Sequence, residues 1–66
     1  MTKAKVRIFN KNKGFLFLEI LTGKYKGAEQ VYFLTDKRKF KFNQIVEVIL
    51  RRSFTHDYVY VSRVRS

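Results

Sequence analysis

The chain of 66 residues contains no cysteine, no proline and no tryptophan, and it has a single histidine. Without cysteine, no disulfide can support the fold, and a cytosol-like compartment is permitted. One histidine cannot supply a tetrahedral ligand set, so we expect no metal and no cofactor. No apolar run is long enough to cross a bilayer, and the basic start Met1–Lys5 is not followed by the apolar region of a signal peptide. We therefore expect a soluble cytoplasmic protein without a membrane partner.

A second domain is also not indicated by the sequence. No repeat, low-complexity tract or linker composition interrupts residues 1–66. The length lies near the lower limit at which one hydrophobic core can stabilise a fold without help. We expect one domain spanning 1–66, and a monomer.

Acidic residues are scarce, with 5 Asp and Glu against 15 Lys and Arg, which gives a net charge of +10. So many cations on a small body repel one another, and this favours a polyanionic partner. Solubility alone is the simpler explanation of a basic chain. The cations are spread among strand-like segments and do not form one face of an amphipathic helix, which argues against a lipid surface.

The residue patterns of common catalytic sites are missing. His56 lies beside Asp57, but a catalytic triad also needs a nucleophile and an oxyanion site that converge in space. Gly23 and Gly27 lack the following helix and the Lys-Ser/Thr pair of a phosphate-binding loop. The glutamates show no paired-carboxylate pattern. We expect no enzymatic activity, and His56 is expected to be an exposed turn residue.

What the chain does contain is a period-two pattern in segments rich in Val, Ile, Phe and Tyr. These segments are 4–10, 15–21, 30–35, 44–51 and 58–64. Five short strands need closure to avoid open edges, and the five-stranded antiparallel Greek-key barrel called the OB-fold closes them compactly. The sequence therefore predicts a small all-β barrel of this kind.

Turn residues separate the predicted strands. Gly14 ends the first turn and is free to take a positive φ. A basic second loop spans 22–27, and the longest connection is 36–43. In that connection Asp36–Lys39 has the composition of a short helical turn, and Asn43 tolerates the left-handed region.

In segments 15–21 and 30–35, alternate apolar side chains point to opposite sides of the sheet. We assign to the barrel interior Leu16, Leu18, Val31 and Phe33. The side chains left in water are then Phe15, Phe17, Tyr32 and Leu34. Such an exposed apolar patch marks a binding site more often than an accident. In the alternative arrangement, Phe15 and Phe17 belong to the core.

Four motifs resemble the cold-shock domain family in order along most of the chain. They are Val6-Arg7-Ile8-Phe9-Asn10, Lys13-Gly14-Phe15-Leu16-Phe17-Leu18, Gln30-Val31-Tyr32-Phe33-Leu34 and Asn43-Gln44-Ile45-Val46. These correspond to the family's first strand, its two ribonucleoprotein motifs and the start of its fourth strand. The chain departs from the family at Leu16, which replaces a glycine, at Ile8, which replaces a tryptophan, and at Leu34 and Thr35, which replace His and Phe.

The resemblance implies a cold-shock-like barrel that binds single-stranded RNA or DNA with little sequence preference. It also implies a role as an RNA chaperone or as a modulator of transcription or translation. Aromatic rings at i and i+2 of a strand can stack unpaired bases while cations contact phosphates. The candidate nucleic-acid-binding residues are Lys5, Arg7, Ile8, Phe9, Asn10, Lys13, Phe15, Phe17, Tyr32, Leu34 and Phe40. Ile8 and Phe40 are included because the family carries aromatic residues at or near their positions.

Two other functions remain open at this point. In the first, the apolar face binds a protein of the transcription or translation machinery, and the positive charge serves an acidic partner. In the second, a basic barrel binds duplex or ribosomal nucleic acid through its cations, and the rings are core. Replacing Phe15 and Phe17 by alanine separates a binding role, which predicts a folded protein that has lost strand binding, from a core role, which predicts unfolding.

Overall fold

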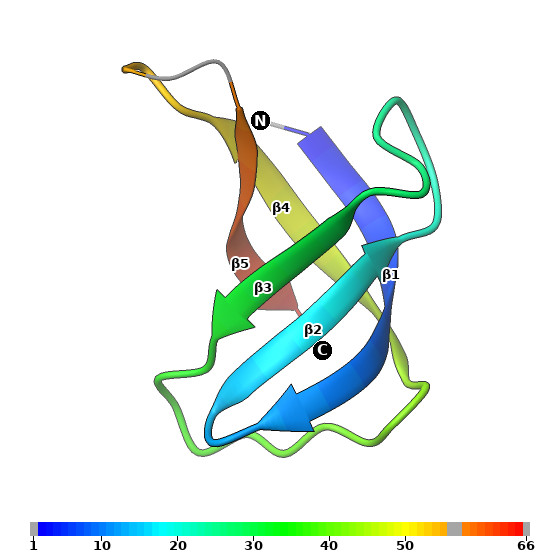
Figure 1. Cartoon of the computed structure of the whole chain (residues 1–66), viewed down its shortest axis with the longest axis vertical. Coiled ribbons are helices and arrows are strands. Elements are labelled where there is room, and N and C mark those ends of the chain that lie inside the picture. Colours follow the sequence, from blue (N-terminus) through cyan, green and yellow to red (C-terminus); the bar gives the residue numbers. More distant parts are fainter. Residues whose placement is uncertain (1, 56–57, 66) are drawn as a thin grey trace.

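The computed structural model describes residues 2–55 and 58–65, and within them five antiparallel strands form one curled sheet (Figure 1). The strands are β1 (Thr2–Asn12), β2 (Phe15–Ile20), β3 (Glu29–Phe33), β4 (Ile45–Arg52) and β5 (Val59–Arg65). Their order in the sheet is β3-β2-β1-β4-β5, and β3 also contacts β5. The sheet is therefore a half-barrel whose two edge strands approach each other, in agreement with a small barrel such as the OB-fold. The predicted fold class is confirmed.

The period-two pattern produces these strands because one side of each strand can then be buried. In β1 the inward side chains are Ala4, Val6 and Ile8, and in β4 they are Val46, Val48 and Leu50. All five strands begin and end within about two residues of the predicted segments. No helix long and apolar enough to span a membrane occurs among the described residues.

A bulge interrupts β1 near its middle. Ile8 lies opposite Leu18, whereas Asn10 lies opposite Phe17, so Phe9 is the extra residue. A bulge bends its strand and increases the local twist. β1 pairs with β4 from Thr2 to Arg7 and with β2 from Val6 to Asn12, so beyond the bulge it pairs with β2 alone.

The connections carry their turns where the sequence predicts them, with one exception. Lys13 and Gly14 both have positive φ, 49° and 87°, and close the β1–β2 hairpin with a two-residue turn. Asn43 has a φ of 66°, which confirms that it occupies the left-handed region. The helical turn predicted for residues 36–39 is wrong, because Asp36 Oδ1 accepts a hydrogen bond from the Arg38 backbone N–H and holds a bend instead.

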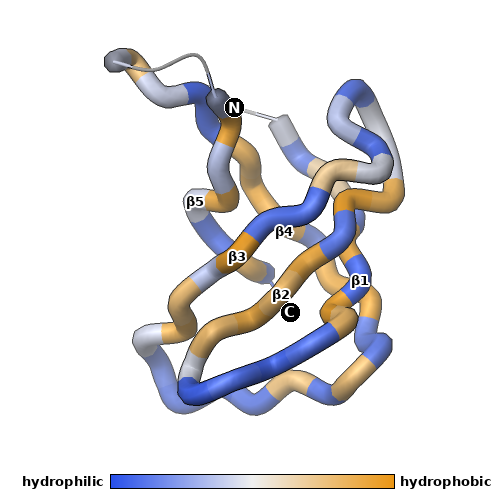
Figure 2. The backbone as a smooth tube through the Cα atoms, in the orientation of Figure 1, coloured by the Kyte–Doolittle hydropathy of each residue, from blue (hydrophilic) through white to orange (hydrophobic). Residues whose placement is uncertain are grey.

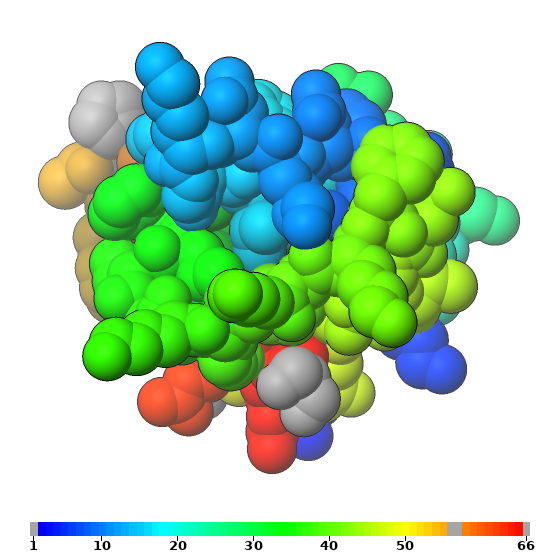
Figure 3. Space-filling model, turned by 90° about the horizontal axis from the view of Figure 1, so that it is seen from below, coloured from blue at the N-terminus to red at the C-terminus, as the bar shows by residue number. Residues whose placement is uncertain are grey.

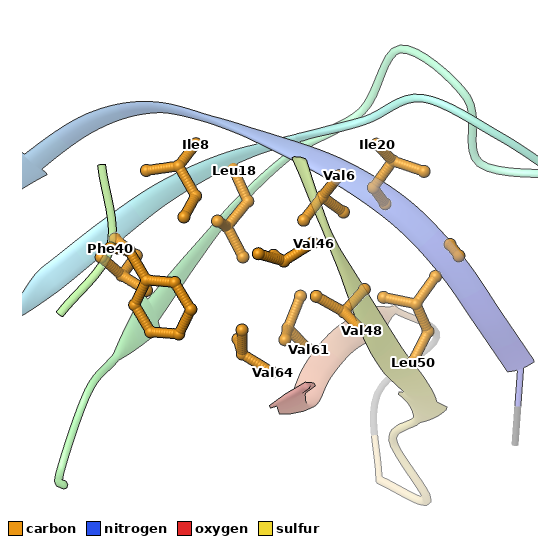
Figure 4. Packing of buried hydrophobic residues seen from close by; sticks show 12 residues of the cluster. Val6, Ile8, Leu18, Ile20, Phe40, Val46, Val48, Leu50, Val61 and Val64 are labelled. Carbon is orange, nitrogen blue, oxygen red and sulfur yellow. The ribbon is translucent and has the colours of Figure 1, made fainter. Parts of the chain in front are cut away.

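The core is apolar and includes one residue from a connection (Figure 4). Its members are Ala4, Val6, Ile8, Leu16, Leu18, Ile20, Phe40, Val46, Val48, Leu50, Val61 and Val64. The Phe40 ring points from the 34–44 connection into the cluster and closes one end of the half-barrel. No described side chain has a buried nitrogen or oxygen without a hydrogen-bond partner.

Two predicted binding residues are therefore core residues. Ile8 is fully buried because it shares the inward side of β1 with Val6. Phe40 is 3% exposed because it packs over core side chains that would otherwise contact water at the open end of the half-barrel. Neither side chain can stack a base in this fold, so the prediction was wrong for both.

Candidate nucleic-acid interface

The outer surface of β2 and β3 carries a group of exposed and half-exposed aromatic side chains. Phe15 lies directly opposite Phe33, and Phe17 lies opposite Val31. Directly opposed residues of antiparallel strands have their side chains on the same face. We call this surface the aromatic face and define it by Phe9, Phe15, Phe17, Val31 and Phe33.

The sides predicted for β2 are confirmed, because Leu16 and Leu18 are buried whereas Phe15 and Phe17 face outward. For β3 the predicted sides were wrong. Val31 and Phe33 are 55% and 53% exposed, and they take the places on the face that were expected for Tyr32 and Leu34.

Tyr32 and Leu34 are half-buried and pack against the core. The physical reason is the register, which sets Tyr32 opposite the inward-facing Leu16. Phe33 was assigned to the wrong side because the predicted segment began at residue 30 and both Tyr32 and Phe33 are aromatic. The charged Glu29 shares the side of Val31 and Phe33 and was the signal that could have marked it as the exposed one.

Two ring pairs organise the aromatic face. The Phe15 and Phe33 ring centroids are 5.0 Å apart with planes tilted by 51°. The Phe9 and Phe17 centroids are 6.4 Å apart with a tilt of 54°. These distances lie in the range of favourable aromatic pairs. The rings therefore support one another while part of each stays in contact with water, as a base-stacking surface requires.

Gly14 makes room for one of these rings. A Cβ atom on Gly14 would lie 3.3 Å from Cε1 of Phe33. The Leu34 N–H also donates a hydrogen bond of 2.8 Å to the Gly14 carbonyl oxygen. The bare backbone of the β1–β2 turn thus lies directly against the end of β3, and this contact fixes the Phe33 ring at the edge of the face.

Arg7 is the most constrained cation near the face. Its Nε and Nη2 both donate to Oε1 of Glu19, at 3.2 and 2.9 Å, and its Nη1 donates to Oδ1 of Asn43 at 2.6 Å. Its guanidinium carbon lies 5.9 Å from the Phe9 ring centroid. Because Glu19 partly neutralises it, Arg7 orders the face and contributes less to phosphate binding than a free cation would.

Lysines supply the accessible charge beside the rings. The end of β1 and the following turn are hydrophilic and run alongside the apolar β2 (Figure 2). Lys13 and Asn10 are exposed there, as predicted for residues at the rim of a binding face. Lys5 is exposed as well, but it lies on the first half of β1, opposite Glu47 of β4, and so apart from the aromatic face.

A depression of about 310 Å³ extends the face toward the closed end of the half-barrel. Its cationic lining residues are Lys11, Lys13, Arg38 and Lys39, and no carboxylate from the described part of the chain lines it. Figure 3 looks onto this end, where the β1–β2 turn and the 34–44 connection meet. The Lys11 Nζ donates to the Phe40 carbonyl oxygen, so this lysine also holds the connection in place.

Asp36 and Arg38 fix the position of the 34–44 connection. The Arg38 backbone N–H and Nε donate to the two Asp36 carboxylate oxygens at 2.9 and 2.8 Å. The backbone hydrogen bond is the main reason that the pKa of Asp36 is lowered from its usual 3.8. Arg38 also donates Nη1 to the Val64 carbonyl at 2.7 Å and covers the Phe40 ring at 5.4 Å.

A row of carboxylates borders the other side of the aromatic face. Glu29 of β3 lies directly opposite Glu19 of β2, one row beyond Phe17 and Val31. The described residues contain no group of His, Cys, Asp and Glu that could hold a metal ion. His56 and Asp57 lie outside the described residues. No family model, curated protein or solved structure matches the chain.

Proposed function

We propose that the chain binds single-stranded RNA or DNA through the aromatic face. The observation that carries this proposal is the pair Phe15 and Phe33, 42% and 53% exposed and in ring contact on a sheet face. Exposed apolar surface of this kind costs free energy in water unless a ligand covers it. Unpaired bases present flat apolar faces that fit such rings, whereas the bases of a duplex are already stacked.

The distribution of charge supports a polyanion as this ligand. Among the described residues, four cations and no carboxylate line the depression next to the rings, within a chain of net charge +10, and of these cations Arg38 is paired with Asp36. Each phosphate of a single strand that is neutralised adds about 0.7 to the slope of log K against log salt. Stacking adds about 1–3 kcal/mol per base and has little sequence preference, so we expect weakly specific binding.

The resemblance to the cold-shock domain also supports base stacking on Phe15 and Phe17. By the same resemblance, we extend the proposal to a role as an RNA chaperone or as a modulator of transcription or translation. The side-chain exposures lead us to revise the proposed stacking set. Phe33 takes part in place of Tyr32 and Leu34, and Ile8 and Phe40 act as core residues. Phe9, held against Phe17, completes the surface.

Fluorescence anisotropy tests this function with labelled oligonucleotides of the same sequence, single-stranded and duplex, in RNA and in DNA. We expect tighter binding to the single strands, and a preference that persists as salt is raised because stacking is not screened. Weak binding that is equal for single strands and duplexes and vanishes with salt would contradict the proposal. That result would favour a protein partner for the aromatic face.

A further inference from the structure

A second cavity, of about 390 Å³, lies at the end of the half-barrel opposite the β1–β2 turn. It is bordered by the 21–28 connection between β2 and β3 (Figure 1) and by residues next to the ends of β4 and β5, Arg52, Tyr58 and Val59. Its floor is apolar and includes Ile20 and Val59, which belong to the core or pack against it. A volume of this size falls in the range of small-molecule pockets.

Aromatic and cationic side chains form the walls of this cavity. Tyr25 and Tyr58 line it together with Lys24, Arg52 and Gln30. The Lys24 Nζ lies 5.7 Å from the Tyr25 ring centroid, so a cation and a ring face occupy the same wall. Tyr58 is 53% exposed, and its ring contacts that of Tyr60 at a centroid distance of 6.2 Å. Among residues 2–55 and 58–65, no carboxylate lines the cavity.

These groups together define the chemistry of a fitting ligand. The apolar floor and the tyrosine rings favour a flat aromatic group, and the Lys24 ammonium favours an anion next to it. The side-chain amide of Gln30 can donate to and accept from the hydrogen-bonding edge of a base. A nucleotide combines a flat base, a polar edge and a phosphate in one molecule.

The carboxylate row separates this cavity from the aromatic face. Glu19 and Glu29 occupy opposed positions on β2 and β3, between Phe17 and Val31 on one side and the 21–28 connection on the other. Only Glu19 of the two has an ion pair among the described residues, the one with Arg7. A phosphate backbone that crossed this row would meet negative charge, so the two surfaces are not parts of one continuous track.

We propose that this cavity is a second nucleotide-binding site, independent of the aromatic face. It takes a nucleoside monophosphate unit, either free or within a single strand. A domain with one site on the outer face of the sheet and another at an end of the half-barrel can hold two segments of nucleic acid at once. Such a domain would bring two strands together instead of only coating one.

Amide NMR spectra of the full chain, titrated with adenosine monophosphate and separately with a single strand of about eight nucleotides, test this proposal. The glycines provide reporters, because Gly14 lies beside the aromatic face and Gly23 and Gly27 lie in the connection that borders the cavity. We expect both ligands to shift Gly23 and Gly27. Shifts with adenosine monophosphate alone would identify a site for the free nucleotide, and shifts with both ligands a site that also accepts a strand.

Lys24→Glu should lower the affinity obtained from the Gly23 and Gly27 shifts by about tenfold. The affinity obtained from the Gly14 shift should be unchanged. The matched control is Lys26→Glu, which makes the same charge change in the same connection at a residue that does not line the cavity. Equal weakening by both variants would show an unspecific charge effect and overturn the proposal. Shifts confined to Gly14 would overturn this second site while leaving the aromatic face in place. Shifts confined to Gly23 and Gly27 would support this second site and contradict binding at the aromatic face.

Discussion

Phe15 and Phe33 are cross-strand partners whose ring centroids lie 5.0 Å apart on the outer face of the half-barrel. Both side chains remain about half exposed in spite of this contact. A core pair would be shielded from water, and unrelated surface residues would not be in ring contact. The pair therefore forms one preorganised apolar surface, and its members are expected to act together.

A double-mutant cycle on Phe15 and Phe33 measures this coupling. Phe15→Ala and Phe33→Ala should each weaken single-strand binding by about 1–3 kcal/mol, the range for loss of one stacked base. The double variant should lose less than the sum, because each ring positions the other. Chemical denaturation should show all three variants folded. Strictly additive losses would mean that the two rings bind independently.

Gly14→Ala should reduce binding by displacing Phe33, since the new Cβ would lie 3.3 Å from that ring. The variant also places alanine at a φ of 87°, which costs about 1–2 kcal/mol of stability. Gly23→Ala is the matched control, because its φ is 85° and its Cβ would meet nothing within 4 Å. Both variants should lose similar stability in urea denaturation, and only Gly14→Ala should lose affinity. If Gly14→Ala and Gly23→Ala bound single strands with equal affinity, the position of Phe33 would not matter for binding.

The position of Phe40 leads to a prediction about stability. Phe40→Ala removes a buried ring and should cost about 3–5 kcal/mol. A domain of 66 residues has a free energy of unfolding of only roughly 3–10 kcal/mol, so this variant should be largely destabilised. Phe42→Ala, two residues away and 62% exposed, should change stability by less than about 0.5 kcal/mol. Comparison of the two thermal unfolding midpoints decides whether Phe40 is a core residue or a surface one.

The architecture was predictable because burial on one side of a strand leaves a period-two pattern. That pattern located all five strands, and Gly14 and Asn43 marked their turns by tolerating positive φ. In β2 the two sides could also be assigned, since Phe and Leu alternate.

The candidate site was predictable only in part. From Val31 to Leu34 both sides of the strand are apolar, and Phe33 was assigned to the wrong face. Only Glu29, one residue before the predicted segment, marks the side of Val31 and Phe33 as the exposed one. Phe40 lies between two lysines in a polar connection, and that composition suggests a surface loop. The signal that could have identified it is physical: a half-barrel with an open end needs one large apolar side chain to close it.

Asp36→Asn tests the contact that fixes the 34–44 connection. The pKa of Asp36 is lowered by the Arg38 backbone and side-chain hydrogen bonds, so the folded state favours the ionised carboxylate. Its contribution to stability is therefore present above the unfolded value of about 3.8 and is lost as pH falls through the lower folded pKa.

Urea midpoints measured from neutral pH downward should show wild type above Asp36→Asn, with the two curves converging below 3.8. Glu29→Gln removes a carboxylate that has no ion pair among the described residues, and it controls for the change in net charge. If the difference in urea midpoint between wild type and Asp36→Asn stayed constant at all pH values, the ionised Asp36 would have no role in stability.

The most direct test of base stacking on the aromatic face is the salt dependence of single-strand affinity for wild type and for the Phe15→Ala/Phe33→Ala variant. Phe54→Ala serves as the control, because Phe54 is fully exposed and lies in the turn after β4, away from the face. Stacking predicts two parallel lines of log K against log salt, with the double variant displaced to lower affinity and Phe54→Ala superimposed on wild type. If the double variant remained folded and its line coincided with that of wild type, the phenylalanine rings would not bind the strand.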